Sequence, residues 1–271
     1  MRYVLAPLRA VLLAVHILIG LGIAFIAFPL SGTQARRNRI NHVWSHWVLR
    51  LCGARLRVSG QPLGDELAST GMTPGASGRL LLSNHISWID IFAINAAMPC
   101  RFVGKAEIVR WPVVGAMVKH SGTLFIERGR RRAVAEVNDA VKGCLRAGES
   151  IVVFPEGTTT RGDQLLPFHS NLLAPALEPG CEVWPVGLSY RERGQFSDCA
   201  AFIGDMGLVT SLINVLLADR LEIEVAFLPA LPESAHANRH VLARAAHAEL
   251  SAHFGFVEMP EQAEAADNGA G

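Results

Sequence analysis

The chain has 271 residues, of which 50% are hydrophobic and only 18% are charged, and its formal net charge is +1. This length suits one large α/β domain, and the apolar balance indicates association with a membrane. A net charge so close to zero excludes a global field that would draw the protein onto nucleic acid, so no nucleic-acid partner is expected.

The cysteines give no support for a disulfide framework or a zinc site. They number five, are scattered along the chain and form no Cys-x-x-Cys pair. They are expected to be buried thiols of a protein in a reducing compartment. No bound metal is expected, and no bound cofactor is expected either.

A long apolar segment lies near the N-terminus. The segment 10–35 carries no Asp, Glu, Lys or Arg, and nearly every residue from Val11 to Leu30 is apolar. About 20 such residues can span a bilayer, and the absence of a small-residue cleavage site favours a retained anchor over a signal peptide. Arginine is more frequent after the segment than before it, which by the positive-inside rule places the main domain in the cytoplasm. A hairpin that dips into the membrane is the alternative.

The next segment has the spacing of an amphipathic helix. Apolar residues recur there every three or four positions, while the opposite side carries Asn41, Ser45 and Arg50. The apolar face consists of Ile40, Val43, Trp44, Trp47, Val48 and Leu51. A face that bears tryptophan suits a membrane interface. A core-packing helix is the alternative, and the neighbouring anchor favours the interface.

Beyond Gly53 the pattern changes to short apolar runs separated by glycine and proline. Helices are expected at 89–98, 131–147 and 234–254, with a helical turn before Pro112 and a loop at 60–78. Strands are expected at 54–58, 79–83, 101–104, 123–126, 151–154, 183–188 and 222–227. Because strands alternate with helices, the prediction is an α/β fold with a mixed, mostly parallel central sheet covered by helices on both sides.

These elements divide the chain into three regions. Residues 1–52 are expected to form the membrane anchor and the interfacial helix, and residues 53–257 a single α/β domain. Residues 258–271 are rich in Glu, Ala and Gly and are expected to be a disordered tail.

A histidine and an aspartate lie five residues apart, where an apolar strand runs into a helix: His85 and Asp90. Imidazole accepts a proton near neutral pH, and a carboxylate on its far nitrogen fixes the tautomer. A helix turns by about 100° per residue, so the two side chains meet only if the chain bends between them and Asp90 lies in the first helical turn. The alternative is a buried structural histidine beside an ordinary helix-start residue.

Polar residues also follow two other expected strands. Arg128 comes just after the strand at 123–126, and Glu156 and Gly157 come just after the strand at 151–154. In α/β folds, strand ends of this kind build a site at one edge of the sheet. The sequence therefore predicts that these residues gather near His85.

In these blocks the chain resembles the glycerolipid acyltransferase family, which includes the 1-acylglycerol-3-phosphate acyltransferases. Four motifs of the family occur in its order over roughly residues 79–190. They are Asn-His-x-x-x-x-Asp (Asn84, His85, Asp90), Gly-x-x-Phe-Ile-x-Arg (Gly122, Phe125, Ile126, Arg128), Phe-Pro-Glu-Gly-Thr (Phe154 to Thr158) and an apolar-Pro block (Trp184 to Gly187).

The resemblance implies transfer of a fatty acyl group from acyl-CoA or acyl carrier protein to the sn-2 hydroxyl of 1-acylglycerol-3-phosphate. The product is phosphatidic acid, made on the cytoplasmic side of a bacterial inner membrane. His85 is then the general base and Asp90 its orienting carboxylate. The chain has no Gly-x-Ser-x-Gly elbow, consistent with direct attack by the acceptor hydroxyl on the thioester. The expected substrate-binding residues are Asn84, Lys105, Gly122, Arg128, Glu156, Gly157 and Thr158.

One position departs from the family pattern. Many phosphatidate-forming members carry an arginine after Glu-Gly-Thr, where this chain has Thr159. Either Lys105 or Arg161 supplies the missing cation, or the acceptor carries less phosphate charge. The Glu-Gly-Thr-Thr variant, together with the later run Gly204-Asp205-Met206, resembles members that acylate lyso-ornithine lipid. That acceptor is therefore an alternative.

Two alternatives involve a different activity. The first is a non-catalytic membrane lipid-binding protein, against which the intact His85, Asp90, Arg128 and Glu156 argue. The second is a thioesterase or lysophospholipase that uses the same histidine with water.

Overall fold

The computed structural model describes residues 2–27, 30, 32–61, 63–73, 77–110, 115, 121–126 and 131–256. The strands are β1 (Arg55–Gly60), β2 (Arg79–Ser83), β3 (Arg101–Lys105), β4 (Leu124–Ile126), β5 (Ser150–Val153), β6 (Glu182–Glu192), β7 (Gln195–Phe196) and β8 (Leu221–Phe227). The α-helices are α1 (Arg2–Gly22), α3 (Gln34–Cys52), α4 (Asp65–Thr70), α5 (Asp90–Ala97), α7 (Arg131–Arg146), α8 (Leu208–Leu217) and α9 (Arg239–Phe254). Short helices of other types are η1 (Ile23–Ala27), η2 (Ala106–Arg110), η3 (Ser170–Leu172), η4 (Ala174–Leu177) and η5 (Glu233–Ala237).

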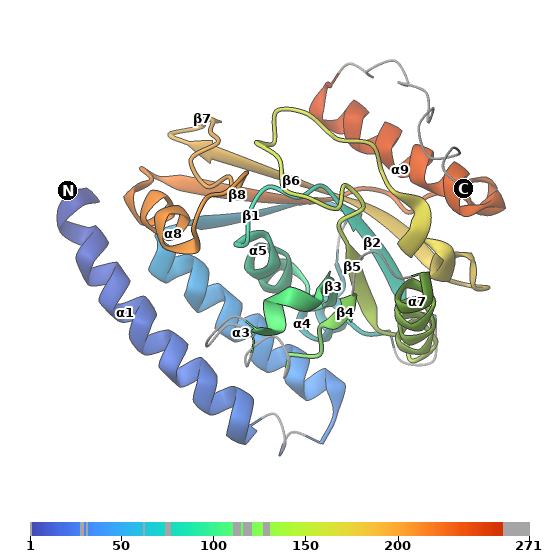
Figure 1. Cartoon of the computed structure of the whole chain (residues 1–271), viewed down its shortest axis with the longest axis horizontal. Helices are drawn as coiled ribbons and strands as arrows, with labels where there is room; N and C mark the ends of the chain where they lie inside the picture. The colour runs from blue at the N-terminus through green and yellow to red at the C-terminus, as the bar shows by residue number, and fades with distance from the viewer. Residues whose placement is uncertain are drawn as a thin grey trace, which may run out of the picture.

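The described strands form one eight-stranded sheet in the order β1-β8-β6-β2-β5-β3-β4, with β7 paired to β6 (Figure 1). Strand β2 is parallel to both of its neighbours, β5 and β6, and β3 is parallel to β5 and β4. Strand β8 runs antiparallel to β6 and parallel to β1. The expected mixed, mostly parallel sheet is thus confirmed. The parallel run brings the carboxyl ends of β2, β5, β3 and β4 to one edge.

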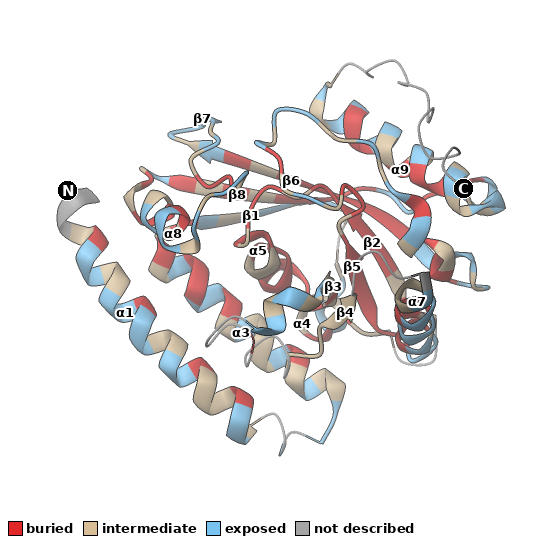
Figure 2. Cartoon of the chain, in the orientation of Figure 1, coloured by how far each residue is buried: buried red, intermediate tan, exposed pale blue. Residues whose placement is uncertain are grey.

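Helices cover both faces of the sheet, because its central strands are apolar on both sides. In β2, Leu81 belongs to a core cluster shared with α3 and α5, while Leu80 and Leu82 belong to a second cluster shared with α7 and α9. Strand β5 alternates in the same way, with Val152 in the first cluster and its neighbours in the second. Figure 2 shows these central strands as buried along their length. Such continuous apolar runs are what a parallel strand between two helical layers requires.

The N-terminal helix lies along the outside of the domain. The stretch Leu5–Ala27 is long and apolar enough to cross a membrane, and only 17% of its most apolar window is buried. Helix α1 nevertheless contacts α3 and α8, and the His16 ring stacks on Trp44 at a centroid distance of 5.2 Å. The large apolar residues Val11 and Leu18 face outward, which suits contact with lipid. A retained membrane anchor stays the prediction for this helix, with a hairpin that dips into the membrane as the alternative.

Helix α3 differs in part from its predicted pattern. Ser45, expected on the polar side, is buried, and Val43 and Trp47 of the predicted apolar face are 56% and 50% exposed. The reason is that α3 packs between α1 and α5 and uses Val48 and Leu49 for that contact. The placement of Ser45 was therefore predicted wrongly.

Three other elements differ from the sequence prediction. Helix α9 begins at Arg239 rather than at residue 234, because the Asn238 side chain accepts the backbone N–H groups of His240 and Val241 and caps the helix there. The loop predicted at 60–78 contains the short helix α4, and α8 was not predicted at all. All five cysteines are free, as expected, although Cys199 is only half-buried.

The division at residue 52 stays a prediction, although α3 ends there. The expected tail, residues 258–271, lies outside the described residues.

Candidate active site

The turn between β2 and α5 brings His85 and Asp90 together. Asp90 is the first residue of α5, and its N–H donates to the carbonyl of Ser87 at 3.2 Å, which closes the turn. The Nδ1 atom of His85 then lies 2.8 Å from the Oδ2 atom of Asp90. The predicted bend between the two residues is confirmed.

The Asp90 carboxylate is completely buried but fully supplied with donors. Its Oδ2 atom also accepts the backbone N–H groups of Ile86 and Ser87, at 2.7 and 2.8 Å, and its Oδ1 atom accepts the hydroxyl of Tyr190. A buried carboxylate with several donors is stable in its charged form. It therefore holds the proton of His85 on Nδ1, and Nε2 is the nitrogen left to act as a base.

The His85 ring is held from its face as well. It stacks on the ring of Phe154 with a centroid distance of 3.9 Å and an interplanar angle of 13°. The side chain is 21% exposed, so one edge of the imidazole reaches solvent. An imidazole that is held by a carboxylate and an aromatic face, and that is partly open to solvent, has the arrangement of a general base.

Glu156 lies beneath His85 rather than at the surface. It is 3% exposed, its Oε1 atom accepts the backbone N–H of His85 at 2.9 Å, and its Oε2 atom accepts that of Leu166 at 3.0 Å. Burial raises the pKa of Glu156 to about 7, against the opposing effect of those two hydrogen bonds, and the nearby charge of Asp90 adds to the rise. Both oxygens support the backbone of the site, and contact between Glu156 and a substrate stays a prediction.

Asn84 is also turned inward. Its side chain donates to the carbonyl of Leu188 at 3.0 Å and accepts the Leu188 N–H at 2.8 Å, and it is 2% exposed. This pair of bonds attaches the turn to strand β6. Its predicted role in substrate binding has no support in these contacts, because they use the amide in the fold.

Of the other predicted substrate-binding residues, Lys105 lies at the carboxyl edge of the sheet, whereas Gly122 lies beside Arg101 at the amino end of β3. Lys105 ends β3, is exposed and pairs in register with Ile126, the last residue of β4. Arg128 follows β4 but lies outside the described residues. Gly122 precedes β4 with a φ of 88°, and its carbonyl accepts Nε of Arg101 at 2.6 Å.

The segment after β5 forms one wall of the site. Gly157 has a φ of 68°, which glycine adopts without strain, and the next residue, Thr158, is exposed. The Thr159 hydroxyl donates to the carbonyl of Phe202, and the Thr160 N–H donates to the carbonyl of His85 at 2.8 Å. At the position where many phosphatidate-forming members carry an arginine, this chain thus has a threonine whose hydroxyl binds the protein's own backbone.

Sequence reasoning missed Tyr190, which lies 100 residues beyond Asp90 in the chain. The available signal was a tyrosine two residues beyond the strand predicted at 183–188, a strand that in the structure continues to Glu192. A buried tyrosine hydroxyl needs a hydrogen-bond partner. Spacing alone could not identify which one.

Comparisons with known proteins identify the family of this chain. The model of the Acyltransferase family matches residues 66–189. Over 254 residues the chain is 35% identical to the lyso-ornithine lipid O-acyltransferase of Pseudomonas aeruginosa, covering 89% of this chain and 92% of that protein. This chain belongs to the glycerolipid acyltransferase family. The 1-acyl-sn-glycerol-3-phosphate acyltransferase of Neisseria meningitidis is 36% identical over 166 residues, which are 61% of this chain and 65% of that protein.

A solved acyltransferase structure has a similar fold. The crystal structure of the 1-acyl-sn-glycerophosphate acyltransferase of Thermotoga maritima aligns with a TM-score of 0.67 at 18% sequence identity, covering 94% of this chain and 97% of that one. At this identity the likeness concerns the fold. Its family and the names of its relatives identify this chain as an acyltransferase with a lysolipid acceptor and an acyl donor.

Proposed function

We propose that this acyltransferase moves a fatty acyl group from a thioester, acyl-CoA or acyl carrier protein, to a free hydroxyl of a single-chain lysolipid. The observation that carries the proposal is the contact between His85 Nδ1 and Asp90 Oδ2, which leaves Nε2 as the base. No metal or bound cofactor takes part in the proposed reaction.

The reaction balances with one histidine. Nε2 of His85 removes the proton of the acceptor hydroxyl as its oxygen attacks the thioester carbonyl carbon. The carbon–sulfur bond breaks, and the carrier leaves as a thiolate that takes the proton from the imidazolium. The products are an ester on the lipid and the free thiol of the carrier. A thioester is reactive enough that no acyl-enzyme intermediate is required.

The favoured acceptor is lyso-ornithine lipid. The lyso-ornithine relative aligns over 89% of this chain, whereas the N. meningitidis relative aligns over 61%. Thr159 supports the same acceptor, since its hydroxyl bonds the Phe202 carbonyl where many phosphatidate-forming members carry a cation.

The second candidate acceptor is 1-acylglycerol-3-phosphate, with phosphatidic acid as the product. It is favoured by the 36% identity to the N. meningitidis enzyme over the core. Exposed Lys105 at the end of β3 and Arg128 beyond β4 are then the cations for the phosphate.

We further propose that the domain acts at the cytoplasmic face of a bacterial inner membrane. The long apolar stretch Leu5–Ala27 supports membrane attachment, and the arginines that follow it support the cytoplasmic side.

A parallel acceptor assay tests these proposals. Purified protein is given acyl-CoA or acyl carrier protein with lyso-ornithine lipid and, separately, with 1-acylglycerol-3-phosphate. We expect acylated lipid without free fatty acid, and a kcat/KM about tenfold or more in favour of lyso-ornithine lipid, the size of one lost charged contact. A preference for the phosphate lipid assigns the second acceptor. Free fatty acid as the sole product contradicts acyl transfer, and lysolipid binding without turnover identifies a lipid-binding protein.

A further inference from the structure

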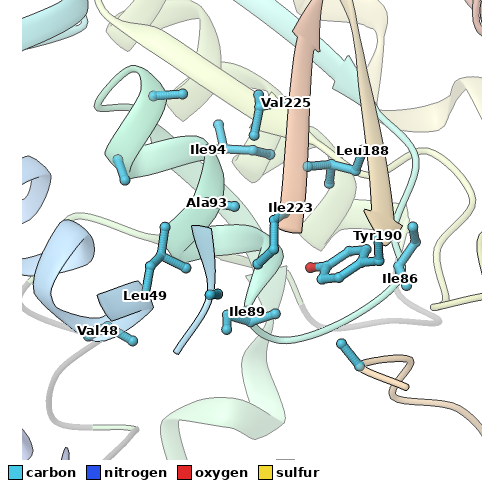
Figure 3. Packing of buried hydrophobic residues seen from close by; sticks show 14 of the residues in the cluster. Val48, Leu49, Ile86, Ile89, Ala93, Ile94, Leu188, Tyr190, Ile223 and Val225 are labelled. Atoms are coloured by element: carbon cyan, nitrogen blue, oxygen red, sulfur yellow. The ribbon is translucent and has the colours of Figure 1, made fainter. Parts of the chain in front are cut away.

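A buried tyrosine contacts the Asp90 carboxylate on the oxygen that His85 does not use. Tyr190 lies on β6, is 1% exposed, and its hydroxyl donates to the Oδ1 atom of Asp90. That oxygen is the one that does not face His85, whose Nδ1 is bound to Oδ2. Figure 3 shows the Tyr190 ring beside Ile86, in the buried cluster of apolar residues.

The structure around the phenol keeps it in place and protonated. Two positions earlier on β6, Leu188 holds the side chain of Asn84 through two hydrogen bonds, so the strand and the turn of His85 move as one unit. Burial, and after it the charge of Asp90, raises the pKa of Tyr190 well above its ordinary value. The hydroxyl is therefore a permanent donor, and loss of its proton plays no part.

We propose that Tyr190 is a positioning residue that sets how strongly Asp90 stabilises the protonated form of His85. The proposal rests on the proposed function, in which His85 is the base. A donor on Oδ1 draws part of the carboxylate charge away from Oδ2. It also fixes the rotation of the carboxylate, so that Oδ2 stays aimed at the Nδ1 atom of His85.

Few other titratable groups face this pair among the described residues. Glu156 contacts the His85 backbone from the segment after β5, and Cys199 faces Tyr190 from the loop after β7. The Cys199 thiol has a pKa raised by burial to about 11, so it stays neutral in the range of interest. Glu156 titrates near neutral pH and must be controlled for.

The first test is Tyr190→Phe, which removes one oxygen and keeps the ring. Without its donor, Asp90 becomes a stronger acceptor for the imidazolium, which then loses its proton at a higher pH. We expect the acid limb of kcat/KM to move to higher pH by about half a unit or more, and kcat to fall about tenfold. The same shift should appear when Tyr190→Phe is combined with Glu156→Gln. That result shows that the acid limb of kcat/KM does not report the titration of Glu156.

A second test acts in the opposite direction without removing the hydroxyl. The chain has only two tyrosines, Tyr3 and Tyr190, so 3-fluorotyrosine incorporated into a Tyr3→Phe variant labels position 190 alone. The fluorophenol is a stronger donor, and the acid limb should therefore move to lower pH. This measurement decides the matter even if Tyr190→Phe does not fold.

A matched control lies on the same strand. Trp184 is buried on β6, and its ring contacts Phe227 and Arg79 rather than Asp90. Trp184→Phe should lower the thermal midpoint and leave the acid limb in place. An unshifted limb in both the Tyr190→Phe variant and the fluorotyrosine protein overturns the proposal for Tyr190 while the proposed function stands. Full activity of a His85→Ala variant instead overturns the proposed function.

Discussion

Replacing His85 with alanine should abolish acyl transfer and leave the fold intact. Its imidazole is the one base that the turn after β2 presents, with Nδ1 bound to Asp90 and one edge open to solvent. General acid–base catalysis contributes about 10²- to 10⁴-fold, so kcat should fall by that factor. The check is initial-rate kinetics with acyl thioester and lysolipid, with free thiol as the readout.

The structure offers a matched control for this variant. His169 lies in the loop after the Phe-Pro-Glu-Gly-Thr motif, and it is exposed. His169→Ala should keep the rate of the parent protein. Both variants should unfold at similar temperatures and remain with the membrane fraction, since neither side chain lies in the apolar helices. A His85→Ala protein that turns over at the parent rate contradicts the assignment of the base.

Local spacing predicted the contact between His85 and Asp90 because the two residues are close in the chain. His85 and Asp90 lie five residues apart, and a strand that runs into a helix start leaves one geometry in which they meet. The sheet was predictable for a similar reason, since runs such as Arg79–Ser83 and Ser150–Val153 are apolar on both faces. Helix α8 escaped prediction because it has neither a charged residue nor a side-chain cap to mark it.

The supports of the pair were not predictable, because their partners lie far along the chain. Glu156 is 71 residues from His85, and Tyr190 is 100 residues from Asp90. Motif spacing does not encode such distances, and the substrate contact that the resemblance implies for Asn84 and Glu156 stays a prediction. In the structure both of these side chains are buried and form hydrogen bonds with the backbone of the turn or of its neighbours.

These long-range contacts explain why a site on a loop can be well ordered. The turn of His85 is held from β6 by Leu188 and Tyr190, from the segment after β5 by Glu156, and from the adjoining loop by the Thr160 N–H. A general base must stay within about 0.5 Å of its productive position. Supports on several independent segments of the chain provide that restraint.

Of these supports, Glu156 should give the protein a distinctive dependence of stability on pH. The pKa of Glu156 is about 7 in the folded protein and 4.5 in the reference state. Between these values the folded state holds a proton that the unfolded state has lost, so this group lowers the free energy of unfolding as pH rises from 4.5 to about 7. The full effect is roughly 3 kcal/mol, and it is absent at pH values below the unfolded pKa.

Glu156→Gln should remove that slope, because an amide does not titrate. The amide also turns an N–H₂ group toward one of the two backbone donors, from His85 or Leu166, so one hydrogen bond is lost. We expect the variant to be less stable than the parent at about pH 5, to approach or exceed its stability at about pH 8, and to be about tenfold less active at every pH. Urea unfolding at several pH values measures the first two effects.

Glu178→Gln is the control, because it alters an ion pair with Arg146 on the other face of the sheet. Its free energy of unfolding should differ from that of the parent by the same amount at each pH. If the free energy of unfolding of Glu156→Gln also differs from that of the parent by the same amount at each pH, Glu156 is already ionised well below neutral pH. Burial of its carboxylate then destabilises the fold far less than its surroundings indicate.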